Sequence, residues 1–185
     1  MINELIADAE SRMKKSIIAL RSELSKLRTG RASTALLDHI RVDYYGTSSP
    51  LNQVSTLTVI DARTIAINPW EKSMIPVIEK AIIESDLGLN PMSAGETIRV
   101  PIPTLTEERR REITKVARSE GESCKVAIRN IRRSVNSDLK EWHREKEITE
   151  DDERSGQDQV QTLTDRFTSE VDEIIGQKEQ EIMTI

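Results

Sequence analysis

Residues 106–146 read TEERRREITKVARSEGESCKVAIRNIRRSVNSDLKEWHREK and contain no proline. Thr106 is the predicted N-cap of a helix, and Glu107 and Glu108 suit its first turn, where negative charge meets the positive end of the helix dipole. The apolar residues keep a helical spacing and form a seam on one face: Ile113, Val116, Cys124, Ala127, Ile131, Val135, Leu139 and Trp142. Forty residues of helix span about 60 Å, which is too long for a small compact globule.

Two further long helices flank this one in the sequence. In residues 1–31, apolar residues alternate at steps of three and four, with Asn3 as the predicted N-cap and Thr29-Gly30 as the stop. Thr149 is the predicted N-cap of the last helix, and the acidic residues 150–153 fill its first turn. The two seams comprise Ile2, Ile6, Ala9, Met13, Ile17, Leu20, Leu24 and Leu27 in the first, and Val160, Leu163, Phe167, Val171, Ile174, Lys178 and Ile182 in the second.

A different pattern occupies the region between these helices. All six prolines lie between Pro50 and Pro103, and proline breaks helix interiors. One helix is predicted at 73–86, with Pro76 in its first turn and Gly88 after its end. The β-like runs are 40–45, 54–60, 64–67 and 97–102, with turns predicted at 46–50 and 61–63.

The sequence therefore predicts an α+β fold with two domains. An elongated antiparallel three-helix bundle comprises residues 1–30 and 105–185, and a small β-rich domain of residues 31–104 is inserted into it. The chain crosses between the domains twice, at Gly30-Arg31 and at Thr104-Leu105. We expect residues 29–31 and 104–106 to form a hinge.

The composition excludes several classes of protein and of binding site. The net charge of −5 is uneven: residues 1–31 carry +3, residues 106–147 carry +3 and residues 148–185 carry −8. Cys124 is the only cysteine, which excludes an internal disulfide and a multi-thiolate zinc site. The sequence has no run of about 18 apolar residues and no recognisable secretory signal at its start, so we expect a cytoplasmic protein that does not bind a membrane.

The central helix also carries a stripe of cations. With Ile131 at zero on a helical wheel, five basic residues fall between about 100° and 160°, and no acidic residue between 109 and 137 shares that sector. The stripe comprises Arg111, Arg118, Lys125, Arg129 and Arg132, and Arg133 flanks it. Such a stripe is a solvated helix face, a surface for an acidic partner protein, or a site for RNA phosphates, which arginine binds bidentately.

Catalytic and metal sites find little support in the sequence. His39 and His143 lie in different predicted domains, and the acidic residues 150–153 lack the glycine and the alternating ligands of a calcium loop. Neither a glycine-rich phosphate loop nor a Ser or Cys nucleophile motif is present. We therefore predict a protein that is not an enzyme and needs no metal or cofactor.

Six motifs resemble the bacterial ribosome recycling factor family and run in its order along essentially the whole chain. They are KLRTGRAS at 26–33, VDYYGT at 42–47, SDLGLNP at 85–91, IRVP at 98–101, LTEERR at 105–110 and VAIRNIRR at 126–133. The resemblance implies an L-shaped protein with tRNA-like dimensions. It further implies a monomeric factor that binds the post-termination ribosome and, with elongation factor G and GTP, splits it into subunits.

The resemblance also implies which residues meet RNA. The arginine that matches Arg132 is the main contact with large-subunit ribosomal RNA in the family, and Arg129 and Arg133 lie beside it. Arg110 and Arg28 match further basic positions. Together with the stripe, the predicted RNA-binding set is Arg132, Arg129, Arg133, Arg110, Arg28, Lys125 and Arg118, and the predicted hinge is Gly30, Arg31, Thr104 and Leu105.

The alternative from a different functional class is a coiled-coil adaptor that catalyses nothing and whose arginines pair with an acidic partner protein. DNA is not an expected partner. Trp70 and Trp142 match no family role and are interpreted as packing or surface residues.

Overall fold

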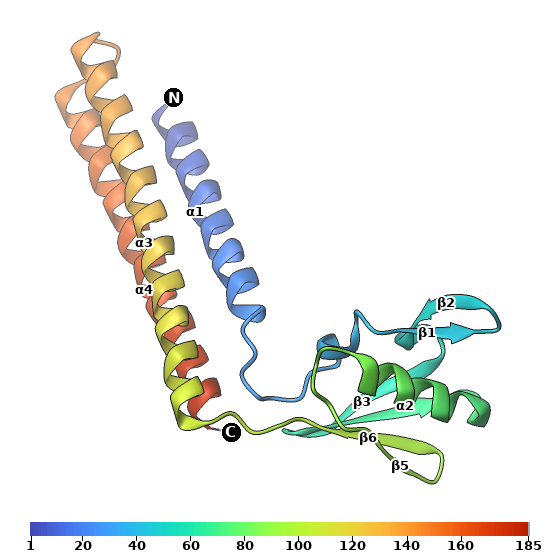
Figure 1. The fold of residues 1–185 in the computed structure, drawn as a ribbon. Coiled ribbons are helices and arrows are strands. Elements are labelled where there is room, and N and C mark those ends of the chain that lie inside the picture. The colour runs from blue at the N-terminus through green and yellow to red at the C-terminus, as the bar shows by residue number, and fades with distance from the viewer. Residues whose placement is uncertain (185) are drawn as a thin grey trace. The chain divides into compact units, whose positions relative to one another are not determined.

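The computed structural model describes residues 1–184 and divides them into two compact units (Figure 1). The helical unit comprises Met1–Arg28 and Glu107–Thr184, and the β-rich unit comprises Thr29–Thr106. The predicted α+β fold, in which a β-rich insert interrupts a helical bundle, is confirmed.

Three helices form the helical unit: α1 (Ile2–Ser25), α3 (Glu107–Arg144) and α4 (Glu150–Met183). They lie side by side: α1 and α4 run in one direction, and α3 runs in the opposite direction (Figure 1). All three contribute to one apolar core, which includes Met13, Leu20, Ile128, Leu139, Val160, Phe167 and Val171. Burial of these side chains is the main driving force for bundle formation. None of the helices in residues 1–184 has the length and apolar character needed to cross a membrane.

The predicted seams of α1 and α4 agree with the core, although α1 ends at Ser25, before the predicted stop at Thr29-Gly30. The α3 seam needs correction: Ala127 is only half-buried, and the neighbouring Ile128 takes its place in the core. Val116 is 45% exposed, and the buried positions nearby are Ala117 and Gly121. A small residue is needed there because a Cβ on Gly121 would lie 2.7 Å from Cγ1 of Ile175 in α4. The wheel favoured the larger apolar residue, whereas close approach of the two helices favours the smaller ones.

The helix starts differ in how they are capped. Thr149 caps α4 through a reciprocal capping box: its Oγ accepts a hydrogen bond from the Asp152 amide at 3.2 Å, and its own amide donates to Asp152 Oδ2 at 3.1 Å. The predicted cap at Asn3 is wrong, because α1 begins at Ile2 and Asn3 lies inside its first turn. Helix α3 begins at Glu107, directly after Thr106.

The β-rich unit contains a four-stranded antiparallel sheet of order β3-β4-β6-β5 and a separate hairpin of β1 and β2 (Figure 1). The elements are β1 (Arg41–Tyr44), β2 (Thr47–Pro50), β3 (Ser55–Asp61), β4 (Thr64–Pro69), α2 (Ile75–Glu84), β5 (Met92–Ala94) and β6 (Thr97–Pro101). The four predicted strands and the helix are confirmed, and Pro76 does lie in the first turn of α2. Strands β2 and β5 were not predicted, and the turn expected at 46–50 is mostly β2.

One face of the four-stranded sheet forms the core of this unit. Ile65 and Ile67 of β4 and Ile98 and Val100 of β6 are fully buried, and they join a core cluster with Ile78 and Ile82 of α2. The β1–β2 hairpin is fixed by side chains, because Glu71 accepts hydrogen bonds from Tyr44 at 2.8 Å and from Tyr45 at 2.7 Å.

Both segments that lead to the helical unit are bound to the turn between β3 and β4. The Ala32 amide donates to the carbonyl of Ala62 at 2.8 Å, and the Ile102 amide donates to the carbonyl of Arg63 at 2.6 Å. Gly30 adopts a φ of +77°, which glycine tolerates and L side chains rarely adopt. A Cβ at this position would also lie 3.1 Å from Cγ of Leu105, so the two segments are in close contact here.

Candidate nucleic-acid interface

The predicted cations on α3 are held by its packing against the bundle core. Ile128, Ile131 and Val135 are buried, which turns the side chains between them toward solvent. Three arginines therefore lie within two turns of the helix surface, at positions 129, 132 and 133; we call them the arginine cluster. Arg133 is exposed, whereas Arg129 and Arg132 are half-buried.

Two other cations of the predicted stripe are neutralised by α4. Arg118 makes a bidentate contact with Glu179, at 2.5 Å from Nε and 3.3 Å from Nη2. Lys125 lies 2.6 Å from Asp172 and 3.5 Å from Glu122. The hydrogen bonds to Glu179 and Asp172 raise the pKa of Arg118 and of Lys125 above their ordinary values, so both stay charged and paired.

The wheel places no acidic residue of 109–137 in the sector of the stripe, yet three of its five cations are paired in the structure. Arg118 and Lys125 pair with carboxylates of α4, which a wheel of α3 alone does not represent, and Glu122 just outside the sector also reaches Lys125. Arg111 pairs at 2.5 Å with Glu107, which lies one turn earlier and before the stretch 109–137.

The arginine cluster is different. Arg129, Arg132 and Arg133 form no ion pair with any carboxylate among residues 1–184. Arg132 donates from Nη1 to the side-chain amide oxygen of Gln161 at 3.1 Å, and that amide donates in turn to Asp165 at 2.8 Å. Because the guanidinium has five N–H donors, most of its hydrogen-bonding capacity remains for a ligand.

Three guanidinium groups without carboxylate partners suit a polyanion. Arginine forms bidentate, charge-assisted hydrogen bonds with phosphate, and adjacent arginines can contact successive phosphates of a nucleic-acid backbone. The cluster therefore has the chemistry of a phosphate-binding surface.

The remaining two predicted RNA-binding residues lie elsewhere on the bundle. Arg28 follows the end of α1 and is exposed, whereas Arg110 lies in the first turn of α3, where its Nη1 contacts the Met183 carbonyl at 3.5 Å. Arg110 is 22 residues from Arg132 along α3, or about 33 Å of helix. The seven predicted residues thus fall into three groups: the arginine cluster, two cations paired with α4, and two further basic positions at Arg28 and Arg110.

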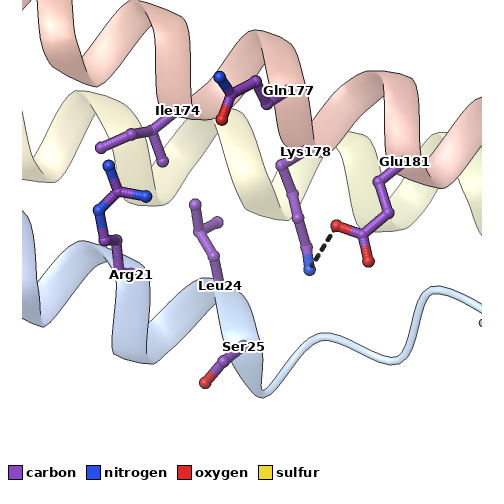
Figure 2. A pocket seen from close by; sticks show the side chains of 7 residues that line it. All are labelled: Arg21, Leu24, Ser25, Ile174, Gln177, Lys178 and Glu181. Carbon is purple, nitrogen blue, oxygen red and sulfur yellow. Dashed lines mark hydrogen bonds and ion pairs between the residues drawn. The ribbon is translucent and has the colours of Figure 1, made fainter. Parts of the chain in front are cut away.

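A groove of about 230 Å³ lies between α1 and α4 and offers a second basic surface. Lys178 points at Glu181 (Figure 2), and the two charged groups are 3.4 Å apart. Arg21 lies 3.8 Å from Glu170. Both cations of the groove are therefore already paired. The lining residues are Arg21, Leu24, Ser25, Ile174, Gln177, Lys178 and Glu181.

The two histidines lie in different units. His39 belongs to the β-rich unit, and His143 of α3 lies 2.6 Å from Glu153 of α4. Residues 1–184 contain no group of three His, Cys, Asp or Glu side chains placed to hold a metal ion. Trp142 packs against the bundle core, and Trp70 is 65% exposed.

Comparison with known proteins agrees with this architecture. The sequence model of the family "Ribosome recycling factor" matches residues 20–183. A ribosome-recycling factor of Paraburkholderia xenovorans is 61% identical over 177 residues, covering 96% of this chain and 95% of the relative. One from Legionella pneumophila (strain Paris) is 59% identical over 185 residues and the full length of both chains. This chain belongs to the ribosome recycling factor family.

Solved structures of the family have the same fold. A solution structure of the ribosome recycling factor has a TM-score of 0.72 and 38% identity, covering 100% of this chain and 98% of that one. A second structure, with a TM-score of 0.62 and 43% identity, covers 99% of both chains. It models the Thermus thermophilus ribosome recycling factor and Escherichia coli elongation factor G bound to the E. coli post-termination complex.

Gln161 of α4 lies beside the arginine cluster and accepts a hydrogen bond from Arg132. Its residue type does not predict this role, because an exposed glutamine on an acidic helix gives no signal by itself. The available signal lay in the spacing of both helices: Arg118, Lys125 and Arg132 follow each other at intervals of seven residues, as do Glu179, Asp172 and Asp165 in the opposite direction.

Proposed function

We propose that this chain binds the post-termination ribosome and, together with elongation factor G, recycles it by splitting it into subunits. GTP is hydrolysed by the partner factor, and the chain itself catalyses no covalent step. It acts in the bacterial cytoplasm as a monomer. Membership of the ribosome recycling factor family, combined with a cluster of arginines without carboxylate partners, carries this proposal.

The arginine cluster is the proposed contact with large-subunit ribosomal RNA. Its three guanidinium groups lie on a rigid helix whose inner face is fixed by buried apolar residues, so they are presented at a constant spacing. Binding through phosphate contacts releases counterions, which makes affinity fall as salt rises. Arg118 and Lys125 are weaker candidates because each must first leave its carboxylate partner on α4.

The residues between the two units are the proposed hinge. Gly30 and Arg31 on one segment, and Thr104 and Leu105 on the other, lie where the chain passes between units. The β3–β4 turn anchors both segments through Ala32 and Ile102, so bending would be confined to the few residues beyond these hydrogen bonds. We propose that elongation factor G acts on the bound factor and that movement about this hinge helps to break the bridges between subunits.

Sedimentation tests the binding step. The purified chain is expected to pellet with vacant ribosomes and with isolated large subunits, and to leave both at high salt. Addition of elongation factor G and GTP is expected to convert ribosomes into subunits only when the chain is present. Absence of pelleting, or splitting that does not depend on the chain, would contradict the proposal.

A disulfide that joins the two units tests the hinge separately. The oxidised form is expected to bind ribosomes normally and to fail in splitting, and reduction of the same sample is expected to restore splitting. The reduced form is the matched control, since it carries the same two substitutions. Undiminished splitting by the oxidised form would show that the units need not move.

A further inference from the structure

Basic residues of α3 and acidic residues of α4 meet in a regular series. Arg118 pairs with Glu179, and seven residues further along α3 Lys125 pairs with Asp172, seven residues earlier on α4. A shared interval of seven residues is expected for antiparallel helices packed along a common seam. Continuing the series by one step brings Arg132 to the level of Asp165.

The third pair does not form. Arg132 and Asp165 make no ion pair, although each is charged and both belong to the series. Instead the side chain of Gln161 lies between them: its amide oxygen accepts from Arg132 at 3.1 Å, and its amide nitrogen donates to Asp165 at 2.8 Å. A neutral amide can satisfy both groups because it presents an acceptor at one end and donors at the other.

We propose that Gln161 is a positioning residue that keeps Arg132 available for RNA phosphate. Its amide nitrogen holds the Asp165 carboxylate by a hydrogen bond, and its amide oxygen takes the place beside Arg132 that a carboxylate would otherwise fill. The inference rests on the function proposed above and extends it to a residue of α4. Gln161 need not touch the RNA. It acts through Arg132 and Asp165.

The physical reason is competition. A guanidinium held by a carboxylate must give up a charge-assisted hydrogen bond before it binds phosphate, whereas one held by an amide gives up a weaker, neutral acceptor. The amide also holds the guanidinium in place, which lowers the entropy lost when the phosphate binds. The arginine therefore remains both charged and ordered, without a competing anion.

Gln161→Glu tests this by creating the missing ion pair. The introduced carboxylate is expected to hold Arg132 as Glu179 holds Arg118, and affinity for large subunits is expected to fall about tenfold, the effect of losing one charge-assisted contact. The slope of log affinity against log salt should decrease by about one. Gln159→Glu is the matched control, because it adds the same charge to α4 at a side chain that contacts Ser155 and, among residues 1–184, no cation. It is expected to bind like the wild type.

Two double variants separate positioning from a general effect on the surface. In the Arg132→Ala background, Gln161→Glu is expected to cause no further loss, since its effect passes through Arg132. Gln161→Ala should weaken binding by freeing Asp165 to pair with Arg132, and Asp165→Asn should restore it. A merely structural role for Gln161 would not be rescued by that second change.

The outcomes distinguish the two proposals. Binding of Gln161→Glu equal to wild type, equal losses in both backgrounds, or no rescue by Asp165→Asn would overturn the role of Gln161 alone. If the wild type does not bind large subunits, the proposed function falls and this inference falls with it. If Arg132→Ala binds like the wild type, Arg132 is not an RNA contact, and the role of Gln161 is overturned as well.

Discussion

Gly121 of α3 packs against Ile175 of α4 so closely that a Cβ on the glycine would lie 2.7 Å from Cγ1 of the isoleucine. We expect Gly121→Ala to destabilise the helical unit by about 1–3 kcal/mol, because the added methyl forces an ordered side chain or the helix itself to move. The loss should be partly offset, because alanine is favoured over glycine in a helix by about 1 kcal/mol. Urea unfolding followed by circular dichroism measures the change.

Gly176 provides the control for that substitution. It lies within α4 and nothing occupies the space within 4 Å of where its Cβ would be. Gly176→Ala is therefore expected to stabilise the protein by about 1 kcal/mol, through helix propensity alone. Equal effects of the two substitutions would show that close packing at Gly121 does not limit residue size.

Arg132 and Arg118 are predicted to differ in their effect on binding. Arg132→Ala should weaken binding to large subunits by about 1–3 kcal/mol, the scale of a charge-assisted hydrogen bond. Arg118→Ala should have a smaller effect, because Glu179 already holds the Arg118 guanidinium. Sedimentation at several salt concentrations gives both affinities, and circular dichroism melts verify that the variants are folded. A larger loss for Arg118 would place the RNA contact elsewhere on α3.

Glu71 is predicted to make the β-rich unit sensitive to acid. Hydrogen bonds from Tyr45 and Tyr44 lower the pKa of the Glu71 carboxyl below its ordinary value, so the folded state favours the ionised form. The contribution of the ionised Glu71 carboxylate to the free energy of unfolding is present at neutral pH and is lost as the pH falls through the lowered pKa. Glu71→Gln should thus destabilise this unit at neutral pH, and the difference from wild type should shrink in acid.

Tryptophan fluorescence can follow the β-rich unit alone. The chain has two tryptophans, so Trp142→Phe leaves Trp70 as the single reporter. Glu79→Gln is the control, because Glu79 of α2 forms no hydrogen bond or ion pair with the described residues. A difference between wild type and Glu71→Gln that stays constant with pH would argue against the role of the carboxylate.

Thr149 is predicted to stabilise the start of α4. Thr149→Ala removes an N-cap and should cost about 1 kcal/mol in the free energy of unfolding. Thr162→Ala, in the middle of the same helix, should cause no loss, since alanine is the better helix former and the Thr162 hydroxyl merely returns to the Asp158 carbonyl. Denaturant titration of both variants compares the same substitution at a cap and within the helix.

The helices were predictable from sequence because their apolar residues repeat with the helical period over many turns. Strands β2 and β5 gave no comparable signal. Strand β2 has four residues and ends at Pro50, and the three residues of β5 are all exposed, so neither shows apolar alternation. Their strand conformation depends on pairing with β1 and β6, which is a tertiary property.

The candidate site was predictable only in part for a related reason. Spacing along α3 shows that its cations share a face, yet whether each is neutralised depends on the register of α3 against α4. That register is set by packing, including the close approach at Gly121 and at Gly156, where a Cβ would lie 2.8 Å from Leu139. Arg118 and Arg132 thus look alike in sequence and differ in the structure.

The insertion of the β-rich unit into the bundle has a consequence for how the protein is made. Residues 29–106 are contiguous, so this unit can complete its sheet once β6 has left the ribosomal exit tunnel. Helix α1 is synthesised first but lacks its packing partners until α3 and α4 emerge. The nascent chain therefore carries an amphipathic helix whose apolar side stays uncovered until α3 and α4 are available to pack against it.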